Sequence, residues 1–272
     1  MRHLATILAV VGCGLQAGVR AQQPSERPSF EVASIRPSAP GTRYGLRILP
    51  GGRLSVTHAT VQRLILTADV LHESQLAGGP SWLYADGFDI EARSSAGAST
   101  DRPEMMGRLR TLLNERFGLR TQTELRDAAV YALVLARADK KLGEFIRPSA
   151  IDCEAADAAT KLALSRGEVP AGPRCGVSFS GGAEVTVMRY GAMTMSQIAM
   201  GLSQTAGRMV VDQTGLSGIF DVELRYTSDP LSSSDAPSIF TATQEQLGLR
   251  LESRRMSVPV MVVDRVERPT EN

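Results

Sequence analysis

Two pairs of carboxylates are the residues in this chain of 272 amino acids whose type and spacing could do chemistry. Asp89 and Glu91 stand two residues apart, and Asp221 and Glu223 repeat that spacing. In glycoside hydrolases two carboxylates ~5–10 Å apart flank the scissile bond and act as acid and as base or nucleophile. The pattern therefore keeps open a hydrolase with paired carboxylates in a cleft.

An arginine two residues after each pair favours a different interpretation. Arg93 follows the first pair and Arg225 follows the second. Because side chains alternate between the two faces of a strand, each arginine shares one face with the acids before it. Ion pairing on a solvated strand face explains both groups without catalysis, so the hydrolase stays the alternative function.

Other residue types of catalytic sites lack their usual partners in this sequence. His58 precedes a predicted helix cap and is expected in a solvent-facing turn. His72 has no second histidine four residues on, as the zinc-protease pattern requires. Ser203 and Ser217 lack the flanking glycines of a nucleophile elbow. We therefore predict no catalytic residue, no metal site and no cofactor.

Three residues are candidates for binding rather than catalysis. Trp82, the only tryptophan, ends the turn 78–82 and could anchor a partner in a cleft between the two halves of the chain. Packing beneath that turn, as a lid on a core, is the interpretation that the sequence favours. Asp212 and Thr214 are the equivalent candidates in the second half, where a tight turn rich in glycine over 212–218 is again the simpler interpretation.

An internal repeat provides the elements that position these residues. The hexapeptide 88–93 recurs at 220–225 with four identities, and both copies alternate between apolar and charged residues as half-buried strands do. Matching segments precede and follow each copy in the same order. They are 60–65 with 194–199, and 117–120 with 247–250. The sequence therefore predicts a duplicated unit.

Each unit is expected to have the order β-α-β-β-α-β-β, an α+β fold with helices packed on a mostly antiparallel sheet. The first unit covers 22–137 and ends in a hairpin over 119–135. The second unit covers 184–272, and Thr194 with Gln197 predicts a capping box at the start of its first helix.

The connector between the units, 138–183, holds Cys153 and Cys175 and has no counterpart in the repeat. In a chain that is exported to an oxidising compartment, as the N-terminus predicts, two cysteines indicate one disulfide, with a pair of free thiols as the alternative. Such a disulfide would keep an irregular connector compact.

The N-terminus predicts export. Arg2 and His3 precede an apolar run, and 19–21 offers small or tolerated residues for cleavage, as in a secretory signal peptide over 1–21. Lipidation at Cys13 is the alternative to cleavage after Ala21. We expect a periplasmic or secreted protein that does not span the membrane after cleavage.

Composition disfavours nucleic-acid partners. The formal charge is +1, and 30 − 2 = 28 basic residues against 29 acidic ones leave −1 after removal of Arg2 and Arg20. Nucleic-acid binding requires a strong basic footprint, which this balance lacks. Aromatic residues make up only 5% of the chain, which disfavours a platform for stacking bases or sugars.

Several of these segments together resemble the family DUF3738, also called the Solibacter-type family. They are Phe30–Pro37, 78–82, 88–92, 211–218 and 244–253. The resemblance implies an exported bacterial protein of a group abundant in Acidobacteria, and it implies no activity.

A weaker resemblance is to the short N-terminal module of secretins and TonB-dependent proteins, carried by 207–218 and 240–263. It implies a periplasmic interaction domain. The expected function is therefore non-catalytic binding of an envelope protein or polymer. The alternative is an envelope or extracellular hydrolase using the paired carboxylates.

Overall fold

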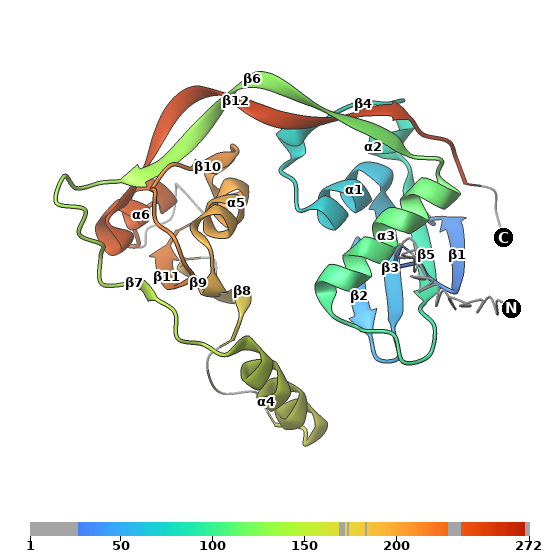
Figure 1. The fold of residues 1–272 in the computed structure, drawn as a ribbon, viewed down its shortest axis with the longest axis horizontal. Coiled ribbons are helices and arrows are strands. Elements are labelled where there is room, and N and C mark those ends of the chain that lie inside the picture. The colour runs from blue at the N-terminus through green and yellow to red at the C-terminus, as the bar shows by residue number, and fades with distance from the viewer. Residues whose placement is uncertain (1–26, 169–171, 173, 183, 228–234, 270–272) are drawn as a thin grey trace, which may run out of the picture.

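The computed structural model describes residues 27–168, 172, 174–182, 184–227 and 235–269. The predicted signal peptide 1–21 and Cys13 lie outside these residues. The described chain forms two lobes, each a four-stranded sheet with its core helices on one face, joined by a long two-stranded ribbon (Figure 1). This is the α+β class with mostly antiparallel sheets that the sequence predicts.

The first lobe is built on an antiparallel sheet with the order β1-β5-β3-β2. Its helices α1 and α3 pack against each other. The strands are β1 (Val32–Pro37), β2 (Gly45–Leu49), β3 (Arg53–Thr60) and β5 (Gly87–Arg93), and the helices are α1 (Val61–Asp69), η1 (Glu73–Gln75), α2 (Trp82–Ala85) and α3 (Arg102–Arg116).

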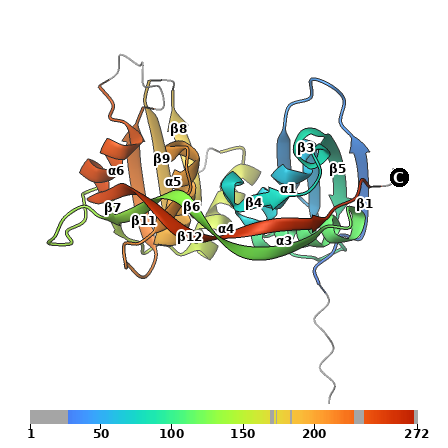
Figure 2. The same ribbon diagram turned by 90° about the horizontal axis from the view of Figure 1, so that it is seen from above.

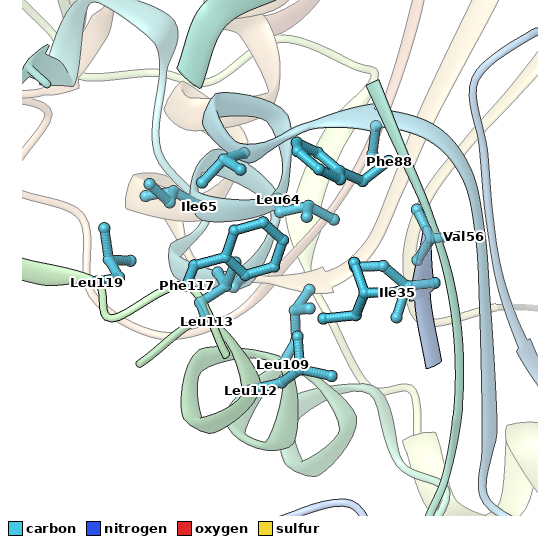
Figure 3. Packing of buried hydrophobic residues seen from close by; sticks show 14 of the residues in the cluster. Ile35, Val56, Leu64, Ile65, Phe88, Leu109, Leu112, Leu113, Phe117 and Leu119 are labelled. Atoms are coloured by element: carbon cyan, nitrogen blue, oxygen red, sulfur yellow. The ribbon is translucent and has the colours of Figure 1, made fainter. Parts of the chain in front are cut away.

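The core of the first lobe explains why its helices form where they do. Thr60 caps α1 by accepting a hydrogen bond from Arg63 N, and the helix then buries Leu64 and Ile65 on one face. Figure 3 shows these side chains around Phe117 and Phe88, whose rings meet edge to face with centroids 5.3 Å apart. Sheet and helices thus share one hydrophobic interior.

The second lobe repeats this arrangement with the sheet order β7-β11-β9-β8. The predicted capping box of Thr194 and Gln197 is confirmed at the start of its first core helix. The strands are β7 (Ile146–Pro148), β8 (Gly176–Gly181), β9 (Thr186–Met193) and β11 (Phe220–Tyr226), and the helices are α4 (Cys153–Ser165), α5 (Met195–Ala206) and α6 (Ile239–Leu247).

The two lobe sheets correspond strand by strand. β5 and β11, the two copies of the hexapeptide, occupy the same inner position in their sheets. These orders support the duplication, which remains an interpretation of the sequence, as does the division at 22–137 and 184–272. The segment 138–183 is more than an irregular connector, because it supplies both edge strands of the second sheet, β7 and β8.

The ribbon joins the lobes and corrects one sequence prediction. Segment 119–135 is not a hairpin: β6 (Arg120–Leu135) is one strand, paired antiparallel along its length with β12 (Leu249–Arg265). Figure 2 shows the two strands running together from one lobe to the other. Two short parallel strands extend this sheet, β10 (Val210–Asp212) beside β6 and β4 (Leu76–Gly78) beside β12.

A small apolar cluster runs along this ribbon. Val130, Val258 and Val260 are buried there together with Met209, and Ala77 and Val211 pack against them from β4 and β10. Within the described residues no helix is long and apolar enough to cross a bilayer.

Candidate functional site

The side chain of Asp89 accepts hydrogen bonds within its own sheet. Its Oδ1 accepts hydrogen bonds from His58 N at 2.9 Å and from Ser38 Oγ at 2.5 Å. His58 has φ of 47°, and the register of β3 against β5 shifts between Val56 and Ala59. A bulge leaves backbone groups without ladder partners, and the carboxylate of Asp89 satisfies one of them.

Asp221 does the same in the second lobe. Its Oδ1 accepts a hydrogen bond from Ala192 N at 3.1 Å, and Ala192 has φ of 52°. Arg147 pairs with the other carboxylate oxygen at 3.5 Å. The first acid of each pair is therefore explained by backbone geometry, a demand that the strand pattern alone did not reveal.

The second acid of each pair lies on the polar face of its sheet. Glu91 accepts a hydrogen bond from Ser55 Oγ at 2.6 Å. Glu223 pairs with Arg189 and Arg225, each at 2.8 Å. Burial raises the pKa of Glu223, but the hydrogen bonds from Arg225 and Arg189 outweigh it, so its pKa lies below the ordinary value. A general acid needs a raised pKa, and Glu223 has the opposite.

The histidines also have structural surroundings. His72 caps η1, because its ring Nδ1 accepts a hydrogen bond from Ser74 N and its backbone N–H donates to Gln75 Oε1. Burial lowers the pKa of His72, partly offset by the charge of Glu73. The ring of His58 lies so close to Gly87 that a Cβ there would be 2.6 Å from Nδ1.

Ser203 is buried and its hydroxyl connects α5 to β10. It donates to Ala199 O at 3.0 Å and accepts from Val210 N at 2.8 Å. Among the described residues there is no group of three or more histidines, cysteines or carboxylates that could hold a metal ion.

Trp82 lies half-buried against the core of the first lobe. Its ring meets Phe88 edge to face at 6.4 Å between centroids. The guanidinium of Arg268 lies 5.0 Å from the ring centroid and also pairs with Asp86. One face of the indole is therefore occupied by the C-terminal segment, as expected for a lid on the core.

Asp212 and Thr214 hold the turn that follows β10. Asp212 Oδ1 accepts from both Thr214 N and Thr214 Oγ1, at 2.9 and 2.8 Å, and Thr214 is buried. Ser196 Oγ donates to the other oxygen of Asp212. These candidates lie at the end of β10, which joins the ribbon sheet beside α5, whereas Trp82 lies in the first lobe, so the structure does not bring the three together.

The concave surface of the second lobe lies elsewhere, beside the connector. The predicted disulfide between Cys153 and Cys175 is present and ties the start of α4 to the start of β8, although α4 contributes no fully buried residue. Two adjoining hollows of about 620 and 690 Å³ lie here and share Arg147, Ile151 and Asp221 in their walls. We call these two hollows the α4 groove.

The walls of the α4 groove differ along its length. One part crosses the polar face of the sheet, where Arg189 and Glu223 lie next to Ser178 and Ser180 of β8. The other part runs beneath α4 and is lined by its alanines. Charged groups at one end and small apolar side chains at the other suit a chain molecule with both kinds of group.

Sequence reasoning missed Arg147, Ile151 and Arg189, because they lie outside recognisable motifs. The one available signal was the pair of cysteines, which marked the connector as a fixed part of the fold.

Comparison with known proteins identifies a family. The family model described as "Protein of unknown function (DUF3738)" matches residues 62–266. No curated protein matches the chain, and no solved structure does. The likeness to secretin and TonB modules thus stays a prediction from the sequence. Because the family model covers most of the chain, this protein belongs to the DUF3738 family.

Proposed function

We propose that this protein is a non-catalytic binding protein of the cell envelope, periplasmic or secreted, that takes a peptide segment of a partner protein in the α4 groove. The observation that carries the proposal is the groove itself: adjoining hollows with charged groups at one end and an alanine wall at the other. The predicted signal peptide supports export, and the disulfide fits an oxidising compartment.

The charges in the groove favour a peptide over a uniformly charged polymer. Arg147 and Arg189 alternate there with Asp221 and Glu223, so both signs are presented within one surface. A peptide offers amide donors, carbonyl acceptors and side chains of either charge, which such a surface can match. The low aromatic content disfavours the ring stacking on which sugar binding often depends.

The carboxylates support binding rather than hydrolysis. Asp89 and Asp221 each accept a hydrogen bond from a backbone N–H at a bulge. Glu223 pairs with two arginines. The two acid pairs lie in the sheets of different lobes, so the four carboxylates do not converge on one site. This arrangement gives the hydrolase alternative no support.

A random dodecapeptide library displayed on phage, selected against the purified protein with its disulfide intact, tests the proposal. Selected peptides are then titrated against Arg147→Glu, which reverses a charge in the groove on a side chain that is mostly solvent-exposed. Arg265→Glu is the matched control, because Arg265 is an exposed arginine on the ribbon with one carboxylate partner.

We expect Kd to rise at least tenfold for Arg147→Glu and to stay unchanged for Arg265→Glu. Failure to select any peptide overturns the proposal, as does equal binding by both variants. A parallel titration with sheared peptidoglycan tests whether the partner is a polymer instead of a peptide. If this polymer binds saturably and no peptide is selected, the partner is a polymer and the peptide proposal is wrong.

A further inference from the structure

The edge strands of the three sheets differ in how they are protected. An edge strand presents unpaired N–H and C=O groups, and proteins usually guard it with charge, proline, a bulge or short length. β1 ends in Arg36 and Pro37, β2 carries Arg47, and β7 contains Arg147 and Pro148. β4 and β10 have only three residues each.

Of the edge strands in the described chain, β8 is the one that lacks all of these protections. Its sequence Gly-Val-Ser-Phe-Ser-Gly contains no charge and no proline, and it pairs with β9 over six residues without a register shift. Because β8 is last in the order β7-β11-β9-β8, its second edge has no strand partner in the described chain. Figures 1 and 2 show this edge on the side of the sheet nearest the first lobe.

The hydrogen-bond pattern shows which backbone groups point outward. At the end of the β8–β9 hairpin, Gly182 N donates to Val185 O. Bonded and non-bonded pairs alternate in an antiparallel ladder. Ser180 and Ser178 are thus bonded to β9, opposite Val187 and Arg189. The N–H and C=O groups of the residues between them, Val177 and Phe179, therefore point away from β9.

The side chains of the same two residues are uncovered. Val177 and Phe179 are 48% and 61% exposed. Their counterparts in the first lobe, Leu46 and Ile48, stand opposite Val56 and Leu54 at equivalent positions of β2 and are packed against the core. The second lobe thus leaves bare an apolar strip that the first lobe covers.

The helix that packs on the sheet is also shorter in the second lobe than in the first. α3 in the first lobe has 15 residues, whereas the corresponding α6 has 9. A shorter helix covers less of the sheet on which it packs, and β8 is the strand of the second sheet that carries exposed large apolar side chains.

β8 also adjoins the α4 groove, whose wall includes Ser178, Phe179 and Ser180, and the two serines lie on the face opposite Val177 and Phe179. Arg189 reaches across this face, donating from Nη1 to Ser180 Oγ at 2.9 Å. Its side chain remains 47% exposed. A chain lying along β8 would therefore meet backbone groups at the edge, apolar side chains on one face, and a cation with hydroxyls on the other.

We propose that β8 accepts an extended peptide segment of the partner protein as a fifth strand of the second sheet. Main-chain hydrogen bonds to Val177 and Phe179 would give affinity. Alternate side chains would give specificity, apolar ones against Val177 and Phe179 and acidic or hydroxyl-bearing ones towards Arg189. This inference rests on the proposed function and specifies how one part of the peptide is held, because β8 and the Arg147 strand β7 are opposite edges of the sheet that the groove crosses.

Hydrogen exchange of individual amides provides the direct test, with a peptide selected against the purified protein as the probe. Added strand pairing protects the outward amides of Val177 and Phe179, while those of Ser178 and Ser180, already bonded to β9, change little. We expect exchange at the two outward amides to slow at least tenfold at saturating peptide. Unchanged exchange at both, with the peptide bound, overturns the inference.

Two variants and one control complete the test. Val177→Pro removes an outward donor without removing a β8–β9 bond, since proline is tolerated where the N–H faces away from the ladder. Phe179→Ser removes the apolar contact. Each should raise Kd at least tenfold, whereas Val32→Ser, at an exposed valine on the edge strand β1, should not.

Alternate N-methylation of the peptide should also abolish binding, because it removes the donors of an added strand. The outcomes separate the two proposals. Peptides sensitive to Arg147→Glu but insensitive to Val177→Pro and to N-methylation would overturn strand addition and leave the binding function standing. If no peptide binds, both proposals fall.

Discussion

Asp89 Oδ1 accepts a hydrogen bond from the backbone N–H of His58 at 2.9 Å, at a residue whose φ of 47° takes the chain through a bulge. Asp221 repeats this contact with Ala192 in the other lobe. The aspartate of the repeated strand is thus tied to the shape of the strand beside it.

Replacement of Asp89 by alanine should therefore lower stability. His58 N–H would lose its acceptor in a partly buried position, which costs about 1–3 kcal/mol of unfolding free energy. Asp89→Asn keeps an acceptor oxygen and should lose less than half as much. Urea unfolding followed by circular dichroism measures both, and equal stability of Asp89→Ala and the parent would contradict this role.

Trp82→Ala should destabilise the first lobe without affecting peptide binding. The indole is half-buried against Phe88 and Arg268, so we expect a loss of about 2 kcal/mol, less than for a fully buried tryptophan. Chemical unfolding gives the stability, and titration with a selected peptide gives the affinity. If a stably folded Trp82→Ala lost peptide affinity, Trp82 would be a binding residue after all.

Removal of the disulfide should release α4 while leaving both lobes folded. Cys153 and Cys175 are 22 residues apart, and closing a loop of that length contributes about 3 kcal/mol in the loop-entropy model. Because α4 has no fully buried residue, the effect should be local. In a Cys153→Ser, Cys175→Ser double variant, hydrogen exchange should be fast in α4 and unchanged in β9 and β11.

The same double variant should weaken peptide binding, since α4 forms one wall of the groove. Retention of protection throughout α4 would show that the helix is held by contacts other than the disulfide.

Glu223 should stabilise the folded protein at neutral pH and lose this contribution to the free energy of unfolding at acid pH. Burial alone would raise its pKa, but the hydrogen bonds from Arg225 and Arg189 lower it below the ordinary value of 4.5 in the folded state. The ionised form therefore stabilises the folded state. This contribution is fully present above pH about 4.5 and is lost as the pH falls through the lowered pKa.

Glu223→Gln should lower stability at pH 7 and make the decline below pH about 4.5 shallower than in the parent. Unfolding midpoints measured between pH 3 and 7 provide the comparison. Glu124→Gln, on the exposed ribbon beside Arg126, serves as the control. If the unfolding midpoints of Glu223→Gln and the parent fell in parallel with pH, this carboxylate would not be the source of the loss of stability in acid.

Local patterns in the sequence were sufficient for the elements that depend on neighbouring residues. The alternation of 88–93 and 220–225 identified β5 and β11, and the spacing of Thr194 and Gln197 identified the cap of α5. The cysteine pair was found for a similar reason, since two thiols in a chain that is predicted to be exported have one intramolecular partner each.

Long-range pairing was beyond those patterns. Arg120 in β6 lies opposite Arg265 in β12, and no local signal distinguishes such a pair from a hairpin within 119–135. β8 was missed because its serines and glycines have low strand propensity, and the α4 groove was missed because its walls come from separate segments.

The ribbon makes the order of synthesis matter. β6 is made long before β12, and β4 also pairs with β12, at Met261–Val263. The first lobe therefore emerges with a 16-residue strand whose main partner does not yet exist. An unpaired strand of that length is a template for association with other chains, so a nascent chain needs protection until β12 is made, and a chain truncated before Leu249 keeps this strand without its partner.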